Sequence, residues 1–167
     1  MAGPGVIIGP GNFNSGSPRI FKTIHKGLRF YPSGSSALVD ARDVARSFIH
    51  LTKDSASYNN RYIQVAETLP LKKMLSHIAY NLNAPKPKYQ VNLPLSLTLA
   101  YIEKLRSLIS GSTPFITPAI AKNSNTVQYY DNSKIKDQLN FEFRNVEDSI
   151  QATCEFFLKQ QASETAN

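Results

Sequence analysis

The sequence has no tryptophan and a single cysteine, Cys154, in 167 residues. One thiol excludes an internal disulfide and any zinc site that is built from several cysteines. A single cysteine is typical of a protein in a reducing compartment, so we expect a cytoplasmic location. Because Cys154 falls on the apolar side of a helical pattern, we interpret it as a core thiol and not as a nucleophile.

Long hydrophobic runs are also missing. The run "VII" near the N-terminus is too short for the apolar region of a signal peptide, and no basic stretch precedes it. The most leucine-rich segment, "LPLSLTLAYIEKLRSLIS" at residues 93–110, carries Glu103, Lys104 and Arg106. These charges are costly at bilayer depth, so we expect a helix in water and no membrane partner.

Charge is present but not concentrated. The net charge is +7, yet the positive residues are scattered in ones and twos and form no run of five or six. A nucleic-acid-binding surface is therefore not favoured. An anionic small ligand suits this charge equally well.

A phosphate-binding loop is absent despite a suggestive spacing. In "GPGVIIGPGNFNSGSP", residues 3–18, the glycines Gly3, Gly5 and Gly9 spell G-x-G-x-x-x-G. A dinucleotide fingerprint places its glycines after a strand and at the start of a helix. Here Gly5 and Gly9 stand on either side of the expected strand, so we interpret them as strand-ending residues.

The sequence offers no complete catalytic or metal-binding constellation. Tyr130 and Lys134 have the Y-x-x-x-K spacing of the catalytic pair of short-chain dehydrogenases, but the "DNS" between them is typical of a helix start. The two side chains should then not share a helical face. His25, His50 and His77 are isolated from one another, so we expect no catalytic residue and no metal site in this chain.

Hydrophobic periodicity predicts a mixed α/β chain. We expect a strand at 6–8, buried on both faces, and further strands at 36–40, 61–66 and 126–131. Helices are expected at 19–27, after Asp40, at 68–83 with Thr68 as cap, at 94–110, after Pro118, at 132–141 and at 145–161. The predicted apolar stripes are Val44, Ala45, Phe48, Ile49 and Leu51; Leu71, Met74, Leu75, Ile78, Ala79 and Leu82; and Val146, Ile150, Cys154 and Phe157.

Three segments in order resemble the extended short-chain dehydrogenase/reductases. They are "PGVIIGPG" at 4–11, "GSSALVDARDVARSFIHL" at 34–51 and "YYDNSKIKDQLNFEFRNVEDSI" at 129–150. The chain is most similar to the NAD-dependent epimerase/dehydratase branch with dihydroflavonol-reductase-like members. The resemblance implies the C-terminal part of a Rossmann-type doubly wound parallel sheet plus a mostly helical substrate-binding subdomain. Residues 1–161 would form this substrate-binding portion, including the last strands of the cofactor domain, and the residue pattern predicts a disordered tail at 162–167.

The resemblance also implies what this chain lacks and binds. The family's cofactor loop and catalytic Tyr and Lys precede these segments, so we expect a missing N-terminal half as partner and no activity from this chain alone. The cofactor of the whole enzyme would be NAD or NADP, facing Pro4, Gly5 and Val6. The loop beyond would contact a small-molecule substrate. Its candidate substrate-binding residues are Asn12, Phe13, Ser17 and Arg19.

The function remains open between alternatives. Val6 stands where sugar-nucleotide epimerases of the family often have Asn, which favours a carbonyl/alcohol oxidoreductase over a nucleotide-sugar epimerase or dehydratase. A non-catalytic basic binding domain is a further alternative. The strand at 6–8 should also have an exposed edge, which predicts aggregation or pairing with another copy in a homo-oligomer.

Overall fold

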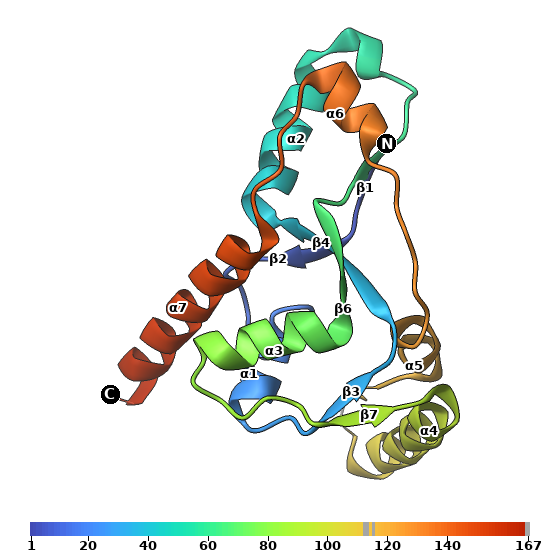
Figure 1. Ribbon diagram of the computed structural model, residues 1–167, viewed down its shortest axis with the longest axis vertical. Helices are drawn as coiled ribbons and strands as arrows, with labels where there is room; N and C mark the ends of the chain where they lie inside the picture. The colour runs from blue at the N-terminus through green and yellow to red at the C-terminus, as the bar shows by residue number, and fades with distance from the viewer. Residues whose placement is uncertain (112–113, 115, 166–167) are drawn as a thin grey trace.

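Short strands alternate with helices along the chain (Figure 1), in a computed structural model that describes residues 1–111, 114 and 116–165. The strands are β1 (Ala2–Pro4), β2 (Val6–Ile8), β3 (Phe30–Pro32), β4 (Ser35–Asp40), β5 (Tyr62–Gln64), β6 (Glu67–Pro70) and β7 (Tyr89–Val91). The helices are α1 (Arg19–His25), α2 (Ala41–Lys53), a 3-10 turn η1 (Ser55–Ser57), α3 (Leu71–Asn81), α4 (Leu93–Ser110), α5 (Pro118–Ser124), α6 (Ser133–Leu139) and α7 (Val146–Thr165). The predicted α/β class is confirmed.

The strands of the described chain form three small sheets. In the largest, β2 lies parallel to β4, with Val6 opposite Leu38 and Ile8 opposite Asp40, while β6 pairs antiparallel with the other edge of β4. β1 pairs parallel with β5, and β3 pairs parallel with β7. Parallel pairs require crossover connections, which the helices between the paired strands supply.

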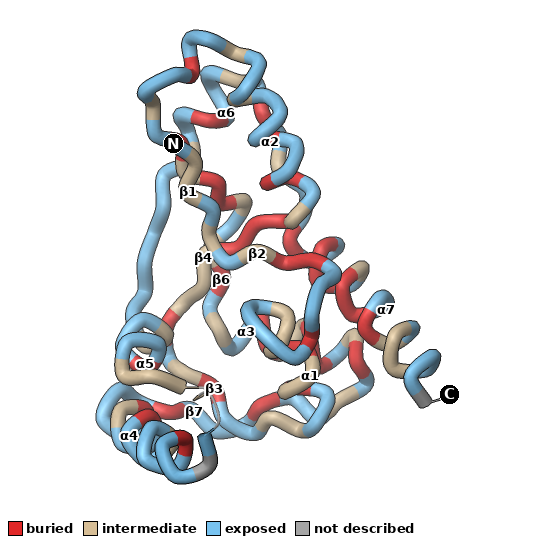
Figure 2. Tube along the Cα trace, turned by 180° about the vertical axis from the view of Figure 1, so that it is seen from behind, coloured by how far each residue is buried: buried red, intermediate tan, exposed pale blue. Residues whose placement is uncertain are grey.

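The hydrophobic core lies where α3 and α7 meet the β2–β4–β6 sheet. α3 packs against α7 and α1, and α7 contacts β2 and β4. Figure 2 shows the buried part of the trace running along β2, β4 and the inner side of α7. The main cluster includes Ile8, Phe13, Phe21, Ile24, Leu38, Leu69, Met74, Leu75, Ile78, Ile150, Cys154 and Phe157. The stripes predicted for the third and last helices are therefore the ones that the core buries.

α2 begins where the sequence predicts, but it buries a different side. The Asp40 side chain caps the helix by accepting a hydrogen bond from the Arg42 amide at 2.7 Å. Ser47 is fully buried and accepts a hydrogen bond from the Gln64 side chain at 2.6 Å. The helix consequently turns Phe48 and the neighbouring Ile49 outward, so the prediction that they belong to a buried stripe is wrong.

Three local predictions are also wrong. β2 is not buried on both faces, because the helical layer covers its Ile8 end and leaves Val6 exposed. Thr68 does not cap a helix. It belongs to β6, where it pairs with Ala37 of β4. Residues 126–131 form no strand, because the Gln128 amide donates to a side-chain hydroxyl and not to a neighbouring strand.

The C-terminal helix extends further than expected. α7 continues to Thr165, since the side-chain amides of Gln160 and Gln161 donate to Glu164 at 3.0 and 2.9 Å and support the last turn. Of the tail expected at 162–167, the residues up to 165 are helical, and 166–167 lie outside the described residues.

Candidate functional site

Gly5 brings the N-terminal strands close to β4. Gly5 lies between β1 and β2, and its amide donates a hydrogen bond to the carbonyl of Gln64, in β5, at 3.0 Å. A Cβ on Gly5 would stand 2.5 Å from the Ala37 carbonyl oxygen, which no real side chain tolerates. A glycine is therefore required for the two backbones to approach here.

A hollow of about 480 Å³ lies beside this crossing, and we call it the strand-end hollow. Pro4, Gly5 and Val6, the three predicted cofactor-binding residues, all line it. Polar side chains from distant segments complete it, among them Arg61, Gln128 and Tyr130. The sequence gives no signal for these three, since they are more than fifty residues from Gly5 along the chain.

A larger, mostly apolar cleft of about 710 Å³ adjoins the first hollow. We call it the helix-lined cleft, because α1, α3, α4 and α5 all contribute to its wall. Ser17 and Arg19, two of the predicted substrate-binding residues, line it together with Val6. Its apolar wall includes Ile20, Leu28, Met74, Leu75, Val91 and Leu99.

The two spaces are continuous in their lining. Val6, Leu71, Ile120 and Ser124 belong to both. Val6 is the one predicted site residue that they share, and its side chain is 42% exposed. The exposed end of β2 therefore lies where the hollow and the cleft meet. The sequence-based prediction of a strand buried on both faces did not indicate this exposure.

The remaining predicted substrate residues lie elsewhere. Phe13 is buried in the core, with its ring centroid 4.9 Å from that of Phe157 and 6.1 Å from that of Phe21, both edge-on. Asn12 is exposed, and its side chain accepts a hydrogen bond from the Asn14 amide at 2.9 Å, which shapes the loop. Neither residue lines the hollow or the cleft.

Tyr130 and Lys134 are separated as the sequence predicts. Tyr130 precedes α6 and lines the strand-end hollow, whereas Lys134 lies in the first turn of that helix. The Lys134 ammonium donates to the Asn60 side chain at 2.9 Å and stands 5.1 Å from the centre of the Tyr62 ring. The pair therefore does not share a helical face.

A buried carboxylate stabilises the end of β4 at the far side of the sheet. Burial acts to raise the pKa of Asp40, but hydrogen bonds from the Arg42 and Ser149 side chains, the Arg42 amide and the Arg42 charge outweigh it and lower the pKa to about 2. The Arg42 guanidinium donates to both carboxylate oxygens, at 2.9 and 2.6 Å. Asp40 is therefore ionised at neutral pH, and its role is structural.

The thiol is not a nucleophile. Cys154 is fully buried, and burial, with a smaller effect of the Glu155 charge, raises its pKa to about 12. A thiol with this pKa carries almost no thiolate at neutral pH. Among the residues that the structure describes, no cluster of His, Cys, Asp and Glu side chains could hold a metal ion.

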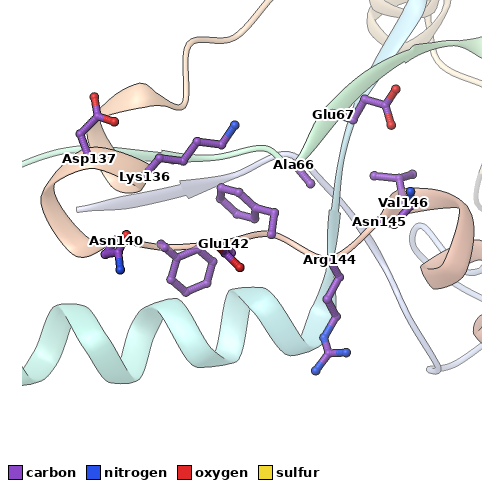
Figure 3. A pocket seen from close by; sticks show the side chains of 11 residues that line it. Ala66, Glu67, Lys136, Asp137, Asn140, Glu142, Arg144, Asn145 and Val146 are labelled. Atoms are coloured by element: carbon purple, nitrogen blue, oxygen red, sulfur yellow. The ribbon is translucent and has the colours of Figure 1, made fainter.

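A third hollow, of about 620 Å³, lies along the segment between α6 and α7 (Figure 3). Its lining mixes charges of both signs, since Lys136 and Arg144 are basic and Glu67, Asp137 and Glu142 are acidic. The Arg144 side chain points away from Glu67 in Figure 3, and its Nε lies 3.6 Å from the buried carboxylate of Asp43. The mixed charge selects no class of ligand.

Known proteins are similar to this chain in sequence or in fold. The chain is 26% identical, over 141 residues, to the "Putative dihydroflavonol 4-reductase" of the cyanobacterium Synechocystis; the match covers 83% of this chain and 41% of that protein. A nucleoside-diphosphate-sugar epimerase from Pseudomonas aeruginosa superposes on 95% of the chain with a TM-score of 0.75 and 19% identity. Yeast methylglyoxal/isovaleraldehyde reductase in complex with NADPH covers 96% with a TM-score of 0.62 and 18% identity.

The resemblance to the extended short-chain dehydrogenase/reductases is confirmed. No family model matches the chain. The chain spans about two fifths of the cyanobacterial relative and about 47% of each of the two solved structures. Within the described part of the chain, no helix has the length and apolar character to cross a membrane.

Proposed function

We propose that the chain forms the substrate-binding portion of an NAD(P)-dependent oxidoreductase that acts on a carbonyl or alcohol. The observation that carries the proposal is the meeting of the two spaces at Val6, with Pro4 and Gly5 on one side and Ser17 and Arg19 on the other. A redox site needs two ligands within contact of each other, and adjoining spaces meet that need. The reductase name of the cyanobacterial relative supports the same class.

The strand-end hollow fits one face of a nicotinamide. Its apolar side chains Ile63 and Val65 suit a flat ring, while the Gln128 amide and the Tyr130 hydroxyl suit a carboxamide. The nicotinamide, when bound, supplies or accepts a hydride. The residues of this chain bind and orient, and none of them is assigned as a general acid or base.

The helix-lined cleft fits the substrate. Its wall is apolar over most of its extent, which excludes water from an aromatic or aliphatic body. Ser17 and Arg19 supply a hydroxyl and a cation that orient a polar or anionic group of the substrate. Each is a positioning group, because neither is a suitable acid or base at neutral pH.

A nucleotide-sugar epimerase or dehydratase is the second candidate, favoured by the similarity to the Pseudomonas epimerase. The apolar lining of the cleft and Val6 in place of Asn count against a sugar substrate. The non-catalytic basic domain remains a third alternative, on the net charge of +7.

Ligand-observed NMR on the chain separates these candidates. We expect saturation transfer to a flat aromatic ketone, such as a dihydroflavonol, and much weaker transfer to a UDP-hexose. Leu99 lines the cleft from α4, and Leu99→Trp should fill part of it and weaken ketone binding about tenfold. Leu105→Trp is the matched control, since Leu105 lies on the same helix outside the cleft.

Three outcomes would contradict the proposal. Equal loss of ketone binding in both Trp variants would show that the ligand does not occupy the cleft. Preferred binding of UDP-hexose would favour the epimerase, and salt-sensitive binding of duplex DNA without ketone binding would favour the basic domain.

A further inference from the structure

Helix α4 is built with its apolar side outward. The side chains that face the protein are Ser96, Ala100, Glu103 and Ser107, spaced by four, three and four residues and therefore in one stripe. Ser96 accepts a hydrogen bond from the Asn125 side chain at 2.9 Å, which fixes this stripe against the end of α5. An ordinary surface helix buries its large apolar residues and exposes its polar ones, and α4 does the reverse.

The outward side carries large apolar residues that nothing in the described chain covers. Leu105 is 62% exposed, Leu108 74% and Ile109 82%. Tyr101 and Ile102 extend the same surface and are about as exposed as Leu105. We call these five residues the α4 outer face. Figures 1 and 2 show α4 at the rim of the molecule, next to α5 and β7 and at the opposite end from α2 and α6.

The charges of α4 do not interrupt this face. Glu103 belongs to the protein-facing stripe and accepts both guanidinium hydrogen bonds of Arg106 at 2.8 Å. With 3.6 residues per turn, Lys104 and Arg106 fall on the two opposite flanks of the α4 outer face. The three charges that argue against a transmembrane position in the sequence are thus compatible with a helix that lies on a membrane.

The local charge selects the occupant. Residues 83–128 contain the bases Lys86, Lys88, Lys104, Arg106 and Lys122 and one acid, Glu103. Basic residues that flank an apolar helical face are typical of helices that lie in the interface of anionic bilayers. A second copy of this chain would instead bring a like-charged surface, on a protein of net charge +7, against the same face.

We propose that the α4 outer face lies in the surface of an anionic lipid bilayer, with the axis of α4 parallel to the membrane plane. At 1.5 Å per residue its 18 residues extend about 27 Å along the surface. Lys104 reaches the headgroups from one flank, and Arg106, whose guanidinium is paired with Glu103, lies on the other flank, while the five apolar residues enter the acyl boundary. The proposal revises the sequence-based expectation of no membrane partner, which weighed only a helix that crosses the bilayer.

Vesicle binding tests this proposal, and the absence of tryptophan makes the readout clean. The chain should float with vesicles of phosphatidylcholine and phosphatidylglycerol and not with phosphatidylcholine alone. Leu105→Trp should shift its emission to shorter wavelength when the anionic vesicles are added. Ile49→Trp is the control, because Ile49 is 55% exposed on α2, far from α4, and its emission should not move.

Two further variants measure the apolar and the charged contributions. Leu105→Glu should weaken vesicle binding about tenfold, while Ile49→Glu leaves it unchanged. Lys104→Gln should weaken binding about fivefold, the effect of one basic residue near an anionic surface. Both altered side chains are exposed, so circular dichroism should show an intact fold.

Other results would overturn the proposal. Absence of flotation with anionic vesicles, or an unshifted emission of Leu105→Trp, would show that no bilayer covers the face. A dimer in sedimentation that Leu105→Glu dissociates would assign the face to a second copy. Neither result bears on ketone binding in the cleft, so this proposal can fail independently of the proposed function.

Discussion

The carboxylate of Asp40 should make the stability of the chain depend on pH in a calculable way. Its pKa is lowered from 3.8 to about 2, chiefly because hydrogen bonds from Arg42 and Ser149 outweigh the effect of burial. At about 1.4 kcal/mol per pKa unit, this shift contributes roughly 2.5 kcal/mol at pH 7. A lowered pKa in the folded state means that the contribution is complete above the unfolded pKa. It falls to about 1.3 kcal/mol at pH 3 and is mostly lost by pH 2.

Asp40→Asn isolates this contribution, because asparagine is an equally good helix cap but carries no charge. We expect the variant to be less stable than the wild-type chain by about 2 kcal/mol at pH 7, with the difference shrinking by half at pH 3. Urea unfolding followed by circular dichroism gives both free energies. Asp137→Asn, at an exposed carboxylate of α6, is the control and should differ from wild type by less than about 0.5 kcal/mol.

The reasoning about Asp40 would be refuted by a stability difference that stays constant from pH 7 to pH 3. Equal stability of Asp40→Asn and the wild-type chain at pH 7 would also refute it. The hydrogen bonds from Arg42 would then stabilise the ionised carboxylate no more than the neutral asparagine cap.

Three further predictions concern other parts of the fold. Asp43→Ala should cost about 3 kcal/mol in urea unfolding, because the buried carboxylate accepts hydrogen bonds from the Arg144 amide at 2.6 Å and the Arg46 side chain at 3.0 Å; a loss below about 1 kcal/mol would contradict this. Gly5→Ala should lower the melting temperature by several degrees, since its Cβ would stand 2.5 Å from a carbonyl oxygen, while Gly3→Ala should be milder because its Cβ would meet only the Tyr62 carbonyl oxygen, at 3.8 Å. Cys154 should react with a thiol reagent at neutral pH only on unfolding, and rapid labelling of the folded chain would show that the thiol is not buried.

Local chemistry predicts some elements well. Asp40 caps α2, and the apolar positions of α3 and α7 form the core that their periodicity indicates. These features depend on residues three or four apart, so the sequence contains all that is needed to recognise them. The motif around Gly5 is likewise a local pattern, and it indicated both the family resemblance and the residues that line the strand-end hollow.

Tertiary contacts decide the rest. Phe13 is an aromatic loop residue of the kind that often lines a pocket, but Phe21 and Phe157 enclose it in the core. The polar side of the strand-end hollow comes from Arg61, Gln128 and Tyr130, which local patterns cannot bring together.

The sequence by itself determined the α/β class, the principal helices and the resemblance to the extended short-chain dehydrogenase/reductases. Only the tertiary structure decided which side of α2 and of α4 is buried. The pattern of α4 fits a helix of either orientation, and its contact with α5 through Ser96 turns the leucines outward. The physical reason is that a helix turns inward the side chains whose hydrogen-bonding groups its neighbours can satisfy. Those neighbours are distant in sequence.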